Sequence, residues 1–279
     1  MRTRPEEAAA KAAVAAGVRV REVAELPELE AVYRLFDLIW RPDPANPPVT
    51  TELMRALTKA GNYVSGAFVG DELVGACVGF FGTPGVMHSH IAGVAPVMAG
   101  RSVGLALKLH QRAWALPRGI SVIEWTFDPL VSRNAYFNLG KLAAEAVEYL
   151  PNFYGGMHDH INGDDDTDRL LVHWRIGAPE VEAACDGTPR RVSAPPGAVV
   201  ALGAENDTPR AGSLDGPALL VAAPRDIETL RRADPRLARQ WRIAVRDTLG
   251  TLLAEGARVA GFDKTGWYVV TRVAKEDNA

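Results

Sequence analysis

Hydrophobic and polar positions follow two different rhythms along this chain. Residues 18–23 read VRVREV, and apolar residues at every second position predict a half-buried strand. Between residues 27 and 40, apolar residues recur at spacings of three and four, which predicts a helix. The same patterns predict further elements: a helix at 51–60, strands at 63–69 and 73–81, a strand ending at Val94, a helix ending at Leu116, a strand at 120–127, a helix at 134–149 and a strand at 169–176.

The rest of the chain is organised around residues 88–116, where a strand, a tight loop and a helix follow one another. Pro96 blocks continuation of the strand because it has no backbone N–H to donate. Only small residues lead into the helix, so its first turn carries no bulky side chain. Backbone N–H groups from Gly100 to Gly104 can therefore approach a pyrophosphate, and the positive end of the helix dipole favours an anion there. The pattern predicts an anion cradle.

Two common nucleotide-binding sites are not supported by the sequence. The chain has no GxxxxGK[ST], which argues against a P-loop, and no GxGxxG after its first strand, which argues against a dinucleotide-binding fold. Residues 94–96 (VAP), followed by residues 100–106 (GRSVGLA), resemble the acyl-CoA pyrophosphate motif of the GNAT superfamily. Ala99 replaces the usual Arg or Gln, and Ser102 replaces a Gly whose N–H it could supply only with a negative φ. The resemblance implies acetyl-CoA or another short acyl-CoA as co-substrate. The implied binding residues are Val94, Gly100, Arg101, Ser102, Val103, Gly104, Leu105 and Ala106, with Asn134 and Asn138 from the later helix.

The resemblance to GNAT proteins covers residues 18–176 and implies an α+β fold with a mixed central sheet flanked by helices. Residues 1–17 are expected to be a frayed Ala-rich helical extension, and the Gly- and Pro-rich residues 177–196 a linker. Residues 197–279 predict a smaller C-terminal α+β domain. Its predicted elements are strands at 198–202 and 218–223, a helix at 225–255 broken at Pro235, and a hairpin at 259–273. The phrases TFDPL, RNAYFN and YLPNFYG resemble a longer GNAT branch, some of whose members are thought to N-acylate amino acids.

Acyl transfer to an amine needs a base, a polarised carbonyl and a stabilised leaving thiolate. His88 and His90 share strand parity with Val94 and are the first candidates for the base, although a histidine in a strand is commonly structural. Asp128, at the end of the next strand, is the main carboxylate rival, with Glu124 beside it. By resemblance, the Val94 N–H polarises the carbonyl. The family's Leu-Tyr pair is missing, and Tyr136 is the nearest hydroxyl to its position.

Composition and charge argue against several classes of partner and ligand. A net charge of −3 gives no basic excess for nucleic acid or an anionic membrane, and two cysteines support neither a disulfide framework nor a thiolate zinc site. The N-terminus lacks a long apolar segment, so we expect a cytoplasmic protein without a secretion signal or anchor. The cluster of His158, His160 and residues 164–166 has no known metal-ligand spacing, so no metal is expected. The polar side of the helix before Leu116 is expected to be Lys108, Gln111 and Arg112, and the arginines from 231 to 242 a solvated face.

These features predict a CoA-dependent N-acyltransferase that transfers directly, in a ternary complex, to the amine of a small molecule such as an amino acid. The alternative from another class is a GNAT-shaped regulatory protein that holds acyl-CoA without turnover. Residues 152–168 are interpreted as a substrate lid, against which residues 197–279 complete the acceptor site. The sequence leaves open the acceptor, the acyl length, the base and whether the chain forms a homodimer.

Overall fold

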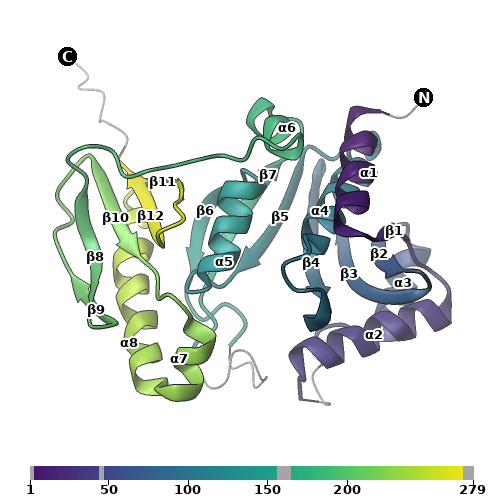
Figure 1. Cartoon of the computed structure of the whole chain (residues 1–279), viewed down its shortest axis with the longest axis horizontal. Coiled ribbons are helices and arrows are strands. Elements are labelled where there is room, and N and C mark those ends of the chain that lie inside the picture. Colours follow the sequence, from purple (N-terminus) through teal and green to yellow (C-terminus); the bar gives the residue numbers. More distant parts are fainter. Residues whose placement is uncertain (1–2, 44–46, 156–164, 273–279) are drawn as a thin grey trace. The chain divides into compact units, whose positions relative to one another are not determined.

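The computed structural model describes residues 3–43, 47–155 and 165–272. The chain divides into two compact units (Figure 1). The first contains Met1–Trp125 and Arg175–Ala178, and the second contains Thr126–Trp174 and Pro179–Ala279. This division differs from the expected linker at residues 177–196, because strands and helices on both sides of that segment pack together in the second unit.

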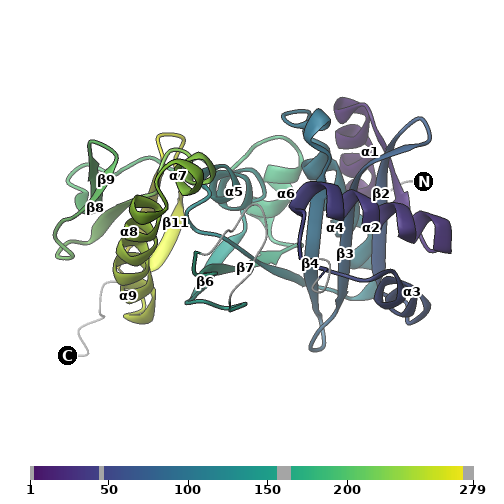
Figure 2. The same cartoon turned by 90° about the horizontal axis from the view of Figure 1, so that it is seen from below.

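The first unit is a sheet with helices on both faces. Its strands lie in the order β1-β2-β3-β4-β5; successive pairs from β1 to β4 are antiparallel, and β4 and β5 are parallel. The strands are β1 (Arg19–Glu22), β2 (Tyr63–Val69), β3 (Glu72–Phe81), β4 (Val86–Val94) and β5 (Val122–Phe127), and the helices are α1 (Arg4–Ala16), α2 (Leu26–Trp40), α3 (Thr51–Lys59) and α4 (Val103–Ala115). The predicted succession of these elements is confirmed. In Figure 2, α2 crosses β3 and β4 on the face opposite α4.

An apolar core fixes α2 and α3 on their face of the sheet. Leu29, Val32 and Met54 from the helices are fully buried against Val64 and Val78 from the strands. The period-three and period-four pattern that predicted α2 is therefore the pattern of its buried side.

Gly93 allows α2 to approach β4 closely. A Cβ built at Gly93 would lie 2.6 Å from Trp40 and 2.8 Å from Ile39, both on α2. Any larger residue here would push the helix away from the strand.

The N-terminal helix is not frayed. Thr3 and Glu6 form a capping box, and Gly17 ends α1 in the left-handed conformation that glycine favours. The helix contacts α4 along its length and buries Ala8, Ala9 and Ala16. Residues 3–17 are thus an integral layer of the first unit, because small alanine side chains let α1 lie close to α4.

A β-bulge interrupts β4. Val78 of β3 pairs with Ile91, but the next residue, Gly79, pairs with Ser89, so His90 is an extra residue in β4. An extra residue exchanges the two faces of a strand. Positions before and after the bulge therefore do not share faces by simple odd and even numbering.

The second unit contains an antiparallel pair, β6 (Glu145–Leu150) with β7 (Arg169–Arg175), and a separate sheet in the order β11-β12-β10-β8-β9. The sheet strands are β8 (Val199–Glu205), β9 (Thr208–Ala211), β10 (Ala218–Ala222), β11 (Arg258–Phe262) and β12 (Trp267–Thr271). The helical segments are α5 (Ser132–Ala135), η3 (Tyr136–Lys141), α6 (Pro179–Cys185), α7 (Ile227–Ala233), α8 (Pro235–Val245), η4 (Arg246–Gly250) and α9 (Thr251–Ala254).

The helix expected at 134–149 is wrong in its second half. Helical structure ends at Lys141, Ala143 has a φ of 54°, and residues 145–150 form β6. Pairing with β7 supplies the backbone hydrogen bonds that a longer helix would have supplied, so a tertiary contact overrides the local pattern. The expected linker also contains α6. The break at Pro235 and the C-terminal hairpin are confirmed.

Candidate functional site

The loop between β4 and α4 leaves backbone donors open at the start of a 13-residue helix. In the described part of the chain, the backbone N–H groups of Arg101, Leu105 and Ala106 each donate to a backbone carbonyl. No backbone acceptor is found there for the N–H groups of Val103 and Gly104. Because both lie in the first turn, their partial positive charge and the helix dipole act at the same point.

Gly104 has no structural reason of its own to be glycine. Its φ is not positive, and the nearest atom to a Cβ built there is Val94 Cγ2 at 4.0 Å. A glycine inside a helix costs about 1 kcal/mol relative to alanine. The missing side chain leaves space beside the half-buried Gly104, which fits the close approach of a phosphate to the first turn.

Ser102 adopts a conformation that the sequence argument did not expect. Its φ is 61° and its ψ is 18°, so the serine lies in the left-handed region and not at negative φ. Its side chain makes no capping hydrogen bond to α4. The backbone at this position therefore has the geometry that glycine favours, and a serine holds it at a cost of about 1 kcal/mol.

Beyond His88, the backbone of β4 separates from β5. Their parallel pairing covers Val86 to His88 of β4 and ends with the pair His88 and Glu124. At the other end of β4, the Ala95 N–H donates to Val74 of β3 at 2.8 Å. Because N–H groups alternate in direction along an antiparallel pair, the Val94 N–H points away from β3, towards the β5 side. This is the orientation needed to polarise a ligand carbonyl between the strands.

His88 and His90 lie on the α2 side of the sheet, whereas Val94 lies on the α4 side. Both histidine rings contact Phe80, with centroid distances of 5.1 and 5.9 Å, and Val94 is the residue nearest Gly104. The expectation that the two histidines share a face of the strand with Val94 is therefore wrong, because the bulge at His90 exchanges the faces of β4.

His88 is the better suited of the two to act as a base. Its Nδ1 lies 3.6 Å from Glu124 Oε1, and its side chain is 20% exposed. Burial lowers the pKa of His88, the neighbouring His90 lowers it further, and Glu124 opposes these effects only in part. The ring is therefore neutral at neutral pH. His90 Nε2 lies 3.1 Å from the Pro48 carbonyl, which can only accept, so that nitrogen carries a proton and is occupied.

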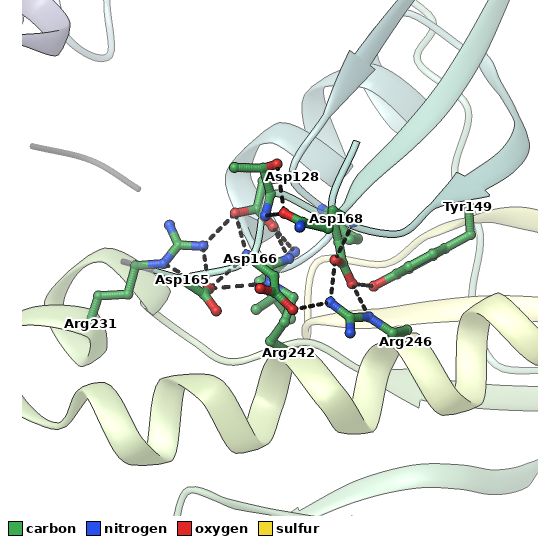
Figure 3. A network of polar contacts seen from close by, with 12 residues as sticks. Asp128, Tyr149, Asp165, Asp166, Asp168, Arg231, Arg242 and Arg246 are labelled. Carbon is green, nitrogen blue, oxygen red and sulfur yellow. Dashed lines mark hydrogen bonds and ion pairs between the residues drawn. The ribbon is translucent and has the colours of Figure 1, made fainter. Parts of the chain in front are cut away.

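Asp128 is the centre of a buried ion cluster in the second unit (Figure 3). Arg242 donates to both of its carboxylate oxygens, at 2.8 and 2.9 Å, and Arg231 donates to Oδ2 at 2.6 Å. The Leu130 N–H also donates to Oδ1. Burial alone would raise the pKa of Asp128, but Arg242 and then Arg231 hold it well below its ordinary value. A carboxylate with every oxygen occupied by cations does not suit the expected role of general base.

The same cluster extends to acidic residues of the segment 152–168, which is interpreted from the sequence as a substrate lid. Asp165 Oδ2 accepts from both Arg231 and Arg242, and Arg246 binds Asp166 and Asp168. The arginine face expected to be solvated is therefore divided: Arg242 is 1% exposed and the Arg231 side chain 8%, whereas Arg232, Arg236 and Arg239 are exposed as expected. His158, His160 and Asp164 lie outside the described residues. Among the residues described, no group of three potential ligands is arranged to hold a metal ion.

Tyr136, Asn134 and Asn138 also belong to the second unit. Tyr136 is half-buried in η3, with Lys264 Nζ 5.7 Å from its ring centroid. Asn138 is buried, and its carbonyl accepts the Ala144 N–H at 2.9 Å. Asn134 is half-buried at the start of the same segment. Their expected roles towards acyl-CoA stay predictions.

Three polar residues of α4 do not lie where the sequence pattern placed them. The side of α4 expected to be polar is buried: Lys108 is 5% exposed, Gln111 0% and Arg112 3%. Lys108 and Gln111 face the sheet, where they contact Ser89 on β4 and Cys77 on β3, and Arg112 Nε donates to the Ile176 carbonyl. The local pattern of α4 does not show these contacts, because their partners lie far away in the sequence.

Comparison with known proteins gives the family. Residues 1–136 match the family model described as "Acetyltransferase (GNAT) domain". This match covers 136 of the 279 residues, and over that part the chain is similar to a GNAT acetyltransferase domain. The mixed sheet flanked by helices agrees with that family. A comparison with curated proteins finds no match.

Solved structures of GNAT proteins are similar at low identity. They include the Escherichia coli ribosomal-protein-S18-alanine N-acetyltransferase (12% identity, 58% of this chain and 95% of that one, TM-score 0.46) and a GNAT acetyltransferase from Streptococcus pneumoniae (13%, 56% and 97%, 0.46). A Salmonella typhimurium protein whose structure was determined with its cofactor acetyl-CoA is also similar, with 14% identity and a TM-score of 0.45. The match covers 58% of this chain and 95% of that one. Within the described residues, no helix has the length and apolar character needed to cross a membrane.

Proposed function

We propose that the protein is a CoA-dependent N-acyltransferase that acts on the amine of a small molecule, such as an amino acid, by direct transfer within a ternary complex. The observation that carries the proposal is the first turn of α4, where the N–H groups of Val103 and Gly104 have no backbone acceptor among the described residues and neither packing nor dihedral angle requires a glycine at position 104. The GNAT family of residues 1–136 supports acyl-CoA as the co-substrate. A cytoplasmic location and a homodimer stay predictions.

The residues of the first unit divide the work of binding and proton transfer. The first turn of α4, from Val103 to Gly104, would hold the pyrophosphate, and the Val94 N–H would bind a carbonyl between β4 and β5. When bound, acyl-CoA supplies the activated thioester. Neutral His88, on the other face of the sheet, is placed to accept the proton of the attacking amine.

Thiol release measured with acetyl-CoA and succinyl-CoA over a panel of small amines and amino acids tests the proposal. We expect release only when an acceptor amine is present, and a sequential kinetic pattern when both substrates are varied, because direct transfer needs both bound together. Acyl-CoA binding by calorimetry without release over the whole panel would favour the regulatory alternative, which the departures at Ala99 and Ser102 support. Absence of both binding and release would contradict either function.

A further inference from the structure

Lys108 places a buried positive charge inside the first unit with only neutral partners. Its Nζ donates to Ser89 Oγ at 2.8 Å and to Gln111 Oε1 at 3.2 Å, and lies 3.7 Å from the ring centroid of Trp125. In the described ranges, no carboxylate lies within ion-pair distance of this ammonium group. Burying a charge without a counter-charge is costly, so proteins rarely retain one without a use for it.

The partners hold the ammonium group in one position. Gln111 Nε2 donates to Cys77 Sγ at 3.4 Å, and Cys77 Sγ lies 3.8 Å from Ser89 Oγ, so both acceptors of the lysine are themselves oriented from β3. Burial lowers the pKa of Lys108 to about 8, which leaves the group charged at neutral pH. The titratable groups around it are Cys77 on β3, His88 on β4 and Glu124 on β5.

The ammonium group lies where β4 and β5 separate. Its contacts Ser89 and Trp125 are the residues that immediately follow His88 and Glu124, the last pair of the β4–β5 ladder. Lys108 also lies one helical turn beyond Gly104, on the same side of α4. One strip of α4 therefore carries both the open N–H groups and the cation. His88 and Glu124 lie on the opposite face of the sheet, since Trp125 points towards α4 and its neighbour Glu124 does not.

We propose that Lys108 stabilises the negative charge on the leaving sulfur of the acyl-transfer reaction. The inference rests on the proposed function. In that reaction the amine nitrogen forms a bond to the acyl carbon, the C–S bond breaks, and the sulfur keeps the electron pair as a thiolate. The proton lost by the nitrogen goes to the His88 side of the sheet, and the charge on sulfur is balanced by the ammonium on the α4 side. Lys108 would thus do for this chain what the missing Leu-Tyr pair does not.

The test compares Lys108→Met, Lys108→Arg and, as a matched control, Lys59→Met on the exposed end of α3. Calorimetry measures CoA and desulfo-CoA, which lacks the sulfur, so the effect of the thiolate is read without turnover. We expect Lys108→Met to weaken CoA about tenfold and leave desulfo-CoA unchanged, because only CoA has a thiol that the ammonium group can hold as a thiolate. The kcat of Lys108→Met should fall on the order of 10²-fold, with little change in the KM for the acceptor. Lys108→Arg should retain part of both effects, and Lys59→Met should behave as wild type.

Circular dichroism and thermal unfolding check the fold of each variant. If Lys108→Met does not fold, Ser89→Ala provides the second test, since it keeps the charge but removes its anchor and should reduce the CoA to desulfo-CoA preference to a smaller extent. An unchanged preference and kcat in a folded Lys108→Met, or in Ser89→Ala where the methionine variant does not fold, would overturn the inference alone. Failure of the wild type to bind acetyl-CoA or release thiol would overturn the proposed function as well.

Discussion

Arg242 on α8 forms a bidentate ion pair with Asp128, with N–O distances of 2.8 and 2.9 Å, and the two residues are 114 positions apart in the sequence. Both side chains are almost fully buried, at 1% and 5% exposure. Arg231 and Asp165 complete the inner part of the cluster. The C-terminal arginines therefore hold the segment after β5 and the segment before β7 in one structure.

Asp128→Asn should destabilise the protein strongly and leave its chemistry intact. The substitution leaves two buried guanidinium groups without their main counter-charge, and breaking a buried pair costs about 3–5 kcal/mol. Urea unfolding measures the loss, with exposed Asp37→Asn on α2 as the control. If the variant unfolds like wild type but loses thiol release, the catalytic role expected from its strand-end position would be restored.

The same cluster predicts acid sensitivity. Burial would raise the pKa of Asp168, but hydrogen bonds from Arg246 and the Asn152 N–H lower it below its ordinary value, and Asp128 is also lowered. A carboxylate with a lowered folded-state pKa stabilises the fold fully above its unfolded pKa of about 4 and loses that contribution as the pH falls further. The free energy of unfolding of wild type should therefore fall below about pH 4, and Asp128→Asn should show a shallower fall.

Gly104→Val should abolish acyl-CoA binding without disturbing the fold. The nearest atom to a new Cβ is 4.0 Å away, so the protein has room for it, but the branched side chain would cover the open N–H groups of the first turn. Calorimetry with CoA measures the effect. Gly177→Val is the control, because it also has open space and no positive φ. Wild-type affinity in Gly104→Val would remove the cradle from the site.

Ser102→Gly should stabilise the protein and keep or improve CoA affinity. The serine occupies the left-handed region at a φ of 61°, and glycine relieves a strain of about 1 kcal/mol there, partly offset by its greater freedom when unfolded. Thermal unfolding with and without CoA measures both quantities. A lower Tm together with weaker binding would mean that the serine side chain itself has a role in the loop.

The difference between what the sequence predicted and what it did not lies in the range of the interactions. Strands and helices from Val18 to Leu116 could be predicted, because each is encoded by its own periodic pattern and by local signals such as Pro96. The facing of His88 could not, since it depends on an insertion of one residue in the pairing of β3 with β4. The burial of Lys108 depends on its contacts with β4 and β5, and the partners of Asp128 depend on the packing of α8, and the local sequence encodes neither.

His88→Gln should lower kcat/KM and remove its dependence on pH in the acid range. Burial and His90 lower the pKa of His88 below the ordinary 6.5, so the wild-type kcat/KM should rise with pH and level off as the ring loses its proton. Rates are compared with an acceptor whose own amine pKa is known, because its titration also raises the rate. His90→Gln is the companion variant. It should keep the rise of kcat/KM with pH in the acid range, since Nε2 of His90 is bound to the Pro48 carbonyl in the wild type. If kcat/KM of His88→Gln still rises with pH in the acid range as in the wild type, another residue is the base.

A chain cut after Ile176 should not fold in its remaining 126–176 part. Removing the later residues takes away Arg242 and Arg246, the partners of Asp128 and Asp168, and also Tyr268, whose hydroxyl donates to the Pro129 carbonyl at 2.7 Å. It also uncovers β6 and η3, which contact β11, α9 and η4 in the second unit. We expect an insoluble or partly unfolded fragment, and recovery when residues 177–279 are co-expressed as a separate chain. Solubility and circular dichroism measure the fold, and thiol release measures the acceptor KM. A shortened chain that is soluble, binds CoA and acylates its acceptor with unchanged KM would show that residues 197–279 are an independent appendage and take no part in the acceptor site.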